Sequence, residues 1–357
     1  MSNSDETKVS DCLNFFPFYE RFNIKLVGSV ISRICISALL GFSFLALHYA
    51  LIGNKIYADW SWFLAVLIIV TMLCLYFATA TLHTLVSAMA RQRPPPDKQA
   101  LLPDLTRILS DRNFVLVGSF FGILNCIVGY SFGLPYSNHS EIATILIGFF
   151  LAGFISGMAV LGIYGVYVTI TGFSKAAALS FDFTEPDNCG GTLFIGDRLV
   201  AFSSVTLIVG VMISFYINRT PWTGVETWWF ITLKYFWIAF PYIMSLVVLI
   251  VPAVPLHNEL LRYKVEQESL LKSRLTGIRR SLTDHQPDVA QRKELRDDYE
   301  FARSVRSDLH KMQTWPFGIG ARLTYLVIFI TNLITSKNIV PNAASAWIKW
   351  LISSATW

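Results

Sequence analysis

Four carboxylates lie close together in one loop of the chain and are its clearest candidate for binding chemistry. They are Asp182, Glu185, Asp187 and Asp197. Carboxylates and turn carbonyls suit hard cations, so this loop is a candidate cation site, although its spacing is not that of an EF-hand and the metal is unknown. The alternative is a structural turn, in which Asp187 bonds to backbone N–H groups and Asp197 caps a helix.

The same loop also carries a short sequence resemblance. It reads Pro186-Asp-Asn-Cys-Gly-Gly191, followed by Leu193 and Gly196. This run resembles a Pro-Asp-x-x-Gly-Gly-Leu cytoplasmic loop of uncharacterised bacterial polytopic membrane proteins, and the stretch 254–257, where a span leads into a charged helix, is similar to theirs. The chain departs from the group at Glu185, where a His is usual, and at Thr192, which displaces the Leu. The resemblance implies an architecture and no activity.

Signatures of enzymes and of nucleic-acid binding are missing from the sequence. The chain contains no HExxH, GxSxG, P-loop or dinucleotide fingerprint, so we predict neither an enzyme nor a cofactor. No basic face alternates with aromatic residues, which argues against nucleic acid.

Ionisable side chains are scarce in the long apolar runs. Arg33, His48, His83 and Lys234 are the ones that fall at membrane depth, and no Asp or Glu does. Proton-coupled carriers usually place carboxylates or histidines near the midplane. Their absence disfavours a secondary transporter and a membrane metalloenzyme.

Small and uncharged polar residues in the apolar runs give a second set of candidates, for pore lining or for helix contact. The set is Gly153, Gly157, Gly162, Gly165, Asn125, Asn332 and Arg33. Gly153 and Gly157 form a GxxxG pair, which lets helix backbones approach closely in lipid. Glycines and amides also suit a water-filled path, and Arg33 would bias such a path if it faced inward. The sequence leaves both alternatives open.

The elements that must position these residues are apolar helices. The chain is 54% hydrophobic and only 15% charged, against about 25% charged in an average soluble domain. A spanning helix needs roughly 20 apolar residues, and the runs that qualify are 26–52, 61–88, 113–134, 142–173, 199–217, 228–254 and 319–336. The predicted fold is an all-α integral membrane protein with about seven transmembrane helices.

The distribution of Lys and Arg predicts the orientation, because basic residues favour the cytoplasmic side. Residues 1–25 form a cytoplasmic N-terminal segment, 26–254 the first six spans, 255–317 a cytoplasmic domain, 318–336 the last span and 337–357 an interfacial tail on the outer face. The expected location is the plasma (inner) membrane.

The domain at 255–317 is predicted to be an antiparallel helical hairpin. Leu271, Leu275, Ile278 and Leu282 recur at helical spacing, and after a break around Pro287 the pattern resumes at Leu295, Tyr299, Ala302, Leu309 and Met312. The hairpin could simply connect two spans, or it could assemble or gate the protein. A two-helix hairpin rarely buries enough surface alone, which favours packing against a neighbour.

These features together favour an oligomeric ion channel or pore, embedded in membrane lipids and assembled or gated through its hairpin. One alternative is a membrane-anchored sensor or effector of a signalling or defence complex, with a soluble protein bound at the hairpin. The other is a small-solute transporter.

Overall fold

The computed structural model describes residues 18–19, 30–52, 61–92, 107–134, 138–175, 181, 187–220, 222, 228–284, 289–318, 320 and 322–330. Its long helices are α3 (Val30–Ile52), α4 (Ser61–Gln92), α6 (Asp111–Ser131), α7 (His139–Lys175), α8 (Leu193–Arg219), α9 (Trp228–Ile250), α10 (Ala253–Asp284) and α11 (Val289–Lys311). Residues 322–330 are also helical, and no strand occurs in these ranges.

Six helical runs among the described residues are long and apolar enough to cross a membrane. They lie in α3, α4, α6, α7, α8 and the run Phe230–Thr283, which covers most of α9 and α10. The backbone groups of such helices bond within the helix, which is what a hydrocarbon environment demands. This supports the predicted class of multi-pass helical membrane protein. The seventh predicted span, 319–336, is described only in part, so the count of seven stays a prediction.

The exterior of the bundle has the character of a lipid-facing surface. Large apolar side chains are exposed along α3 and α6, among them Ile31, Leu39, Phe42, Phe120 and Ile127. An apolar exterior of this extent is rare on a soluble monomer.

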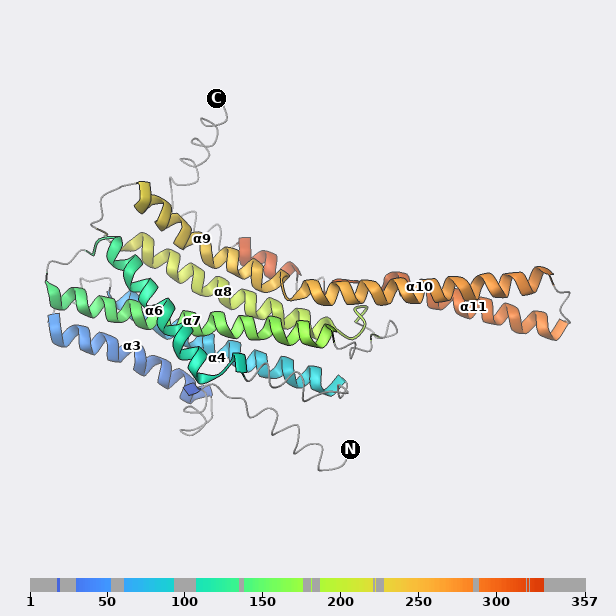
Figure 1. Cartoon of the computed structure of the whole chain (residues 1–357), viewed down its shortest axis with the longest axis horizontal. Helices are drawn as coiled ribbons and strands as arrows, with labels where there is room; N and C mark the ends of the chain where they lie inside the picture. The colour runs from blue at the N-terminus through green and yellow to red at the C-terminus, as the bar shows by residue number, and fades with distance from the viewer. Residues whose placement is uncertain are drawn as a thin grey trace, which may run out of the picture.

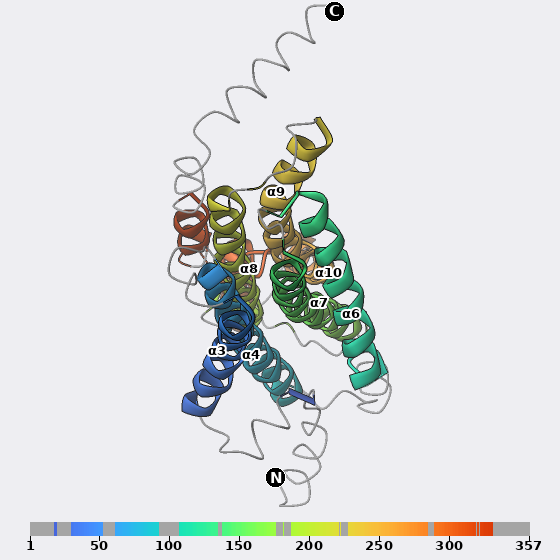
Figure 2. The same cartoon turned by 90° about the vertical axis from the view of Figure 1, so that its left-hand side faces the viewer.

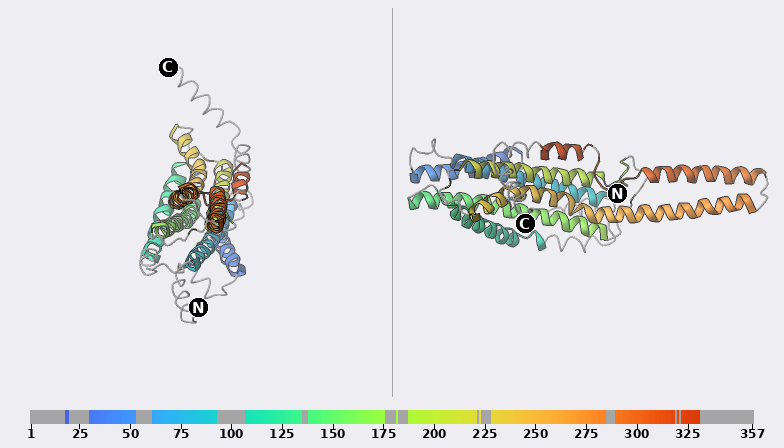
Figure 3. Two further views of the ribbon diagram at one scale, coloured as in Figure 1. Left: turned by 90° about the vertical axis from the view of Figure 1, so that its right-hand side faces the viewer. Right: turned by 90° about the horizontal axis from the view of Figure 1, so that it is seen from above.

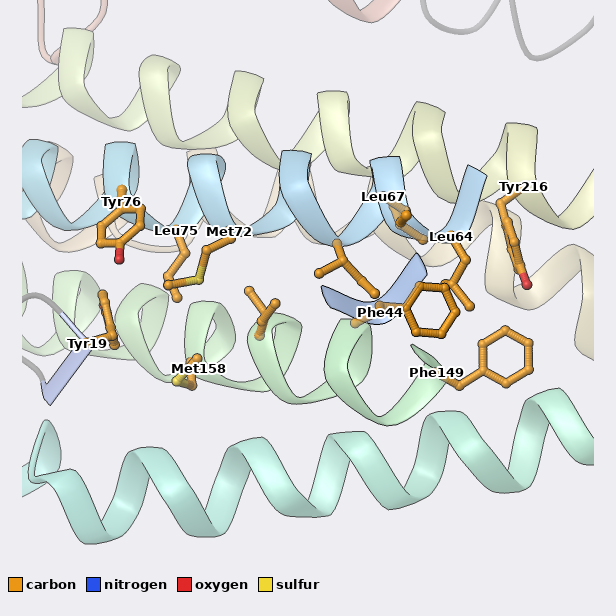
Figure 4. Close-up of a cluster of buried hydrophobic side chains, with 14 of the residues drawn as sticks. Tyr19, Phe44, Leu64, Leu67, Met72, Leu75, Tyr76, Phe149, Met158 and Tyr216 are labelled. Atoms are coloured by element: carbon orange, nitrogen blue, oxygen red, sulfur yellow. The ribbon is translucent and has the colours of Figure 1, made fainter. Parts of the chain in front are cut away.

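The helices form a bundle in which α4, α7 and α8 are central (Figures 1 and 2). On one side of the bundle α6 packs along α7, and on another α9 packs along α8. A core of buried side chains fills the space between α4 and α7. Figure 4 shows Met72 and Leu75 of α4 facing Met158 of α7.

Tyr19 joins this core from the N-terminal segment. Its hydroxyl lies 2.8 Å from Thr79 Oγ1 of α4, and its ring packs edge-on against Tyr76 and Phe114. The sequence pattern did not predict this contact, because the stretch around Tyr19 is mixed in character.

Helices α10 and α11 lie side by side and extend beyond the bundle (Figures 1 and 3). We call the end of the bundle from which they project the hairpin end, and the opposite end the far end. A turn at 251–252 separates α9 from α10. Ile278, Ala302 and Leu309 are buried between the two helices. Exposed ion pairs such as Arg274–Asp298, at 3.5 Å, also link them, each worth about 0–1 kcal/mol.

Candidate functional site

Gly153 and Gly157 lie where α7 crosses α6. A Cβ on Gly157 would lie 2.7 Å from the Val117 carbonyl oxygen and 2.9 Å from the Gly118 Cα. A Cβ on Gly153 would lie 2.9 Å from the Gly122 Cα. Two glycine pairs therefore face each other, one on each helix, and allow backbone contact. The structure thus places these two residues at a helix contact within one chain.

Gly165 and Gly162 have different surroundings. A Cβ on Gly165 would lie 2.9 Å from the side chain of Leu109, whereas a Cβ on Gly162 would meet no atom within 4 Å. Gly162 is therefore a suitable control position on α7.

Substituting Gly157 with alanine should destabilise the α6–α7 contact. The new methyl group would press on the backbone of α6, and overpacking of this kind costs about 1–3 kcal/mol. Thermal unfolding in detergent measures the effect. Gly162→Ala on the same helix should be neutral or stabilising, since alanine is the better helix former. Equal melting temperatures for Gly157→Ala and Gly162→Ala would contradict the close contact between α6 and α7.

Of the other candidates from the apolar runs, Asn125 lies beside Gly153, and both line a cavity inside the bundle, whereas Arg33 lies apart from them. The Asn125 amide donates to the Phe149 carbonyl at 2.8 Å and so links α6 to α7. The guanidinium of Arg33 lies 5.9 Å from the centre of the Tyr76 ring, on the side of α4 that faces α3. Asn332 lies outside the described residues.

Two adjoining cavities lie inside the bundle. The first, of about 110 Å³, is nearer the far end, where Leu64, Phe132 and Trp222 line it. The second, of about 120 Å³, lies at mid-height between α4, α7, α8 and α9. They share lining residues, namely Thr71, Ser156, Val160, Val209, Ile213, Phe240 and Pro241. The two spaces therefore lie next to each other, and we call them together the cavity column.

Among the described residues, the lining of this column is apolar and includes no Asp, Glu, Lys, Arg or His. Several of its donors are already engaged. Ser156 Oγ donates to Ala152 O at 2.8 Å, Thr206 Oγ1 to Phe202 O at 3.1 Å, and Thr71 Oγ1 to Leu67 O. Hydroxyls that bond back to their own helix offer little to water, so the column is expected to be dry.

Packed side chains close the column toward the hairpin end. Leu85 of α4, Ile170 of α7 and Leu199 of α8 are fully buried there, in a cluster that also includes Leu256 and Leu260 of α10. The same cluster that closes the column thus contains the first turns of α10.

Helix α9 contributes a proline to the cavity lining. Pro241 lies inside the helix, where it removes one backbone hydrogen bond and favours a bend. A Cβ on Gly210 of α8 would lie 2.6 Å from the Pro241 Cβ, so the glycine makes room for the proline ring. Pro241 lines both cavities, and α9 leads into α10.

Sequence reasoning missed a buried hydroxyl cluster near the second cavity. Ser203 Oγ of α8 lies 2.7 Å from Ser245 Oγ of α9, which lies 3.0 Å from the Tyr325 hydroxyl. All three side chains are buried. Hydroxyls isolated in apolar runs were the available signal, but their pairing depends on how α8, α9 and 322–330 are placed.

The acidic loop contains an ordered turn. Asp187 Oδ1 accepts from the N–H groups of Cys189 (2.8 Å) and Gly191 (3.0 Å), and Oδ2 from that of Leu193 (3.1 Å). Asn188, Gly190 and Gly191 have positive φ, a conformation that asparagine and glycine tolerate best. Asp187 thus acts in the way expected for a structural turn, and its charge lies favourably at the N-terminus of α8.

The cation-site hypothesis gains no further ligand from the described residues. Asp197 is exposed inside α8, whose N-cap residue is Thr192, so the expectation that Asp197 caps the helix is wrong. No group of three or more His, Cys, Asp or Glu side chains that could hold a metal occurs in the described part of the chain. Asp182 and Glu185 lie outside it.

This turn and residues 312–318 form what we call the junction. The Gln313 N–H donates to Asn188 O at 2.7 Å, and Cys189 Sγ lies 3.6 Å from Trp315 O. From α10, His257 Nδ1 lies 3.0 Å from Thr314 O, and its ring stacks on Trp315 at 4.3 Å. The junction therefore ties the end of α11 and the start of α10 to the start of α8.

Removing the Asp187 carboxylate should loosen the junction. Asp187→Ala leaves backbone N–H groups without their acceptor, which costs about 1–3 kcal/mol for a buried group. The alkylation rate of the buried Cys189 thiol measures how far the junction has loosened. Burial, and secondarily the Asp187 charge, raise its pKa from 9.0 to about 11, so its alkylation at pH 8 should be roughly a hundredfold slower than that of a free thiol and faster in the variant.

Mass spectrometry of the alkylated peptides separates Cys189 from the other cysteines. Asp197→Ala removes an exposed carboxylate that makes a smaller contribution to the raised pKa of Cys189, so it should change the rate less than Asp187→Ala does. Because folding raises the thiol pKa, the stabilisation from the neutral thiol is complete below pH 9.0 and is lost as the pH rises toward about 11. Rapid alkylation of Cys189 in the folded wild type would contradict its placement.

Comparison with protein-family models, with curated proteins and with solved structures finds no match to this chain. The resemblance of the 186–196 loop to uncharacterised bacterial membrane proteins therefore stays a prediction.

Proposed function

We propose that the protein is an oligomeric ion channel or pore, that its conduction path follows the cavity column of each chain, and that the α10–α11 hairpin assembles or gates it. One observation carries the proposal. Both cavities are lined by Pro241 of α9, and α9 runs on into α10, the first arm of the hairpin. A displacement of the hairpin would thus reach the cavity lining directly.

In this proposal the structure represents the closed state of the channel, because its path is lined by apolar side chains and is expected to be dry. An apolar constriction without water is a barrier to ions, and such constrictions gate some channels by dewetting. The packed cluster around Leu199 adds a second barrier toward the hairpin end. Movement of α9 about Pro241 would widen the column and admit water.

The lining favours this function over a small-solute transporter. Coupled carriers use charged or histidine side chains near the midplane to bind a driving ion, and no described Asp, Glu, Lys, Arg or His lines either cavity. The proposal includes no catalytic step and no cofactor.

The proposed topology follows the distribution of basic residues. It has seven spans, a cytoplasmic N-terminus and a cytoplasmic hairpin, in the plasma (inner) membrane with lipid around the apolar exterior. The hairpin exposes Leu261, Val265 and Phe301. Copies of the chain that covered these side chains would give the homo-oligomer.

The second candidate is a membrane-anchored sensor or effector, which the same exposed side chains favour. In that case a soluble protein, rather than another copy, covers the hairpin. Purification from the native membrane that returned a soluble protein at fixed stoichiometry would support this reading.

Recording from planar bilayers that contain the purified protein tests the proposal. Discrete unitary currents that a hairpin variant, Val265→Asp, alters in open probability or assembly would support it. A silent bilayer, over a range of voltages and calcium concentrations with protein shown to be folded and inserted, would overturn it in favour of the sensor or effector.

A further inference from the structure

The cavity column has the properties of a binding site for an apolar ligand. Its cavities of about 110 and 120 Å³ are close in size to an apolar cavity of about 150 Å³ that stays dry and binds benzene or xenon. Empty apolar space is unfavourable, because the atoms around it lose dispersion contacts. An occupant that restored those contacts would be stabilised.

The lining selects against polar occupants. The hydroxyls of Ser156 and Thr206 bond to their own helices, and the Trp222 indole N–H donates to Ile217 O at 2.8 Å. A ligand with donors or acceptors would lose its hydrogen bonds to water and find few replacements, which disfavours its binding. A saturated or aromatic hydrocarbon loses none.

The arrangement of the helices gives the ligand a route from the lipid. Helix α6 packs along α7 and α9 along α8, and the first cavity lies between them. Phe121 and Asn125 line it from α6, and Trp237 and Phe240 from α9. All four are partly exposed, so the cavity lining reaches the surface between the two helices.

We propose that this column binds a hydrocarbon segment, either a small dissolved hydrocarbon or part of a lipid acyl chain, which enters between α6 and α9. If ions pass through this column, a bound hydrocarbon would block them and hold the channel closed. That consequence rests on the proposed function. Binding itself does not require conduction.

Photolabelling of the full-length protein in detergent tests the site. The first probe is a short alkyl diazirine, and the second is a phosphatidylcholine with a diazirine in its acyl chain. We expect the alkyl probe to label residues that line the column, such as Val160 and Phe240. Labelling of the same residues by the lipid probe would identify a membrane lipid as the source, and labelling by the alkyl probe alone would identify a dissolved hydrocarbon.

Matched variants of α7 show whether the labelling reports the cavity. Ser156→Leu and Val160→Phe place bulk at positions that line both spaces, and each should lower labelling of the column at least tenfold. Gly162→Leu adds a side chain where a Cβ would meet nothing within 4 Å and should leave labelling unchanged. Only variants that keep the wild-type melting temperature and elution volume are compared.

Labelling confined to the exposed exterior, or labelling of the column that neither filling variant reduces, would overturn the proposal. The outcome is independent of the bilayer recordings. A labelled column in a silent protein would leave the binding site standing without the channel, and a conducting protein with an unlabelled column would do the reverse.

Discussion

Replacing Val160 with asparagine should raise ion conductance at least tenfold. Val160 lines both cavities, so an amide there would face the dry column without a hydrogen-bonding partner. Burying such a group costs about 1–3 kcal/mol, and about 1.4 kcal/mol already changes an equilibrium tenfold. The free energy of the hydrated, conducting state would therefore fall by that amount relative to the free energy of the dry state. Unitary currents, or ion flux into proteoliposomes, measure the change.

The control lies two residues further along α7. Gly162→Asn introduces the same side chain at a position that lines neither cavity and should conduct like the wild type. If both variants leaked, the amide would be disturbing the membrane or the fold in general. Unchanged conductance in a folded and inserted Val160→Asn protein would place the path elsewhere.

Gly196→Ala should separate the junction and cause the largest loss of stability. A Cβ on Gly196 would overlap the Pro316 carbonyl oxygen and lie 2.6 Å from its carbonyl carbon. Both are backbone atoms, so residues 312–318 or α8 itself must shift. Overpacking costs about 1–3 kcal/mol, and more where the backbone must move. The melting temperature should fall and Cys189 alkylation should accelerate as its contact with Trp315 opens.

The corresponding control is Gly162→Ala, an identical change within a helix. There the added methyl group meets no atom, and alanine improves helix propensity by roughly 0.5–1 kcal/mol. A Gly196→Ala protein with wild-type melting and slow Cys189 alkylation would show that α8 and residues 312–318 are not in contact. In bilayers, the same variant should weaken the response to the hairpin variant Val265→Asp.

The helices could be predicted from the sequence because hydrocarbon leaves the backbone few alternatives. The runs at 61–88 and 142–173, for example, coincide with most of α4 and α7. The apolar run predicts a span that begins at residue 199, whereas α8 begins at Leu193. The Asp187 carboxylate accepts from the Leu193 N–H at this end of the helix. That bond depends on the turn, which the local pattern does not specify.

The candidate site was less predictable because it depends on pairs of residues. Gly157 was singled out by its spacing, but its partner Gly118 was not, since nothing local connects the third apolar run with the fourth. The cavities are even harder to predict from the sequence. Val160 and Pro241 line the same space, and only the arrangement of several helices around that space brings them together. A single sequence contains no signal for the volume that side chains fail to fill.

The contact of Tyr19 constrains the order in which the chain can be assembled. A ribosome delivers residue 19 long before Thr79 of α4 and later Phe114 of α6, so neither partner exists when the N-terminal segment emerges. The tyrosine must remain outside the core until at least these two helices have been inserted, and only then can its hydroxyl exchange water for Thr79. Tyr19 is thus synthesised before both of its partner helices, yet its packing against α4 and α6 can be completed only after both helices have been made.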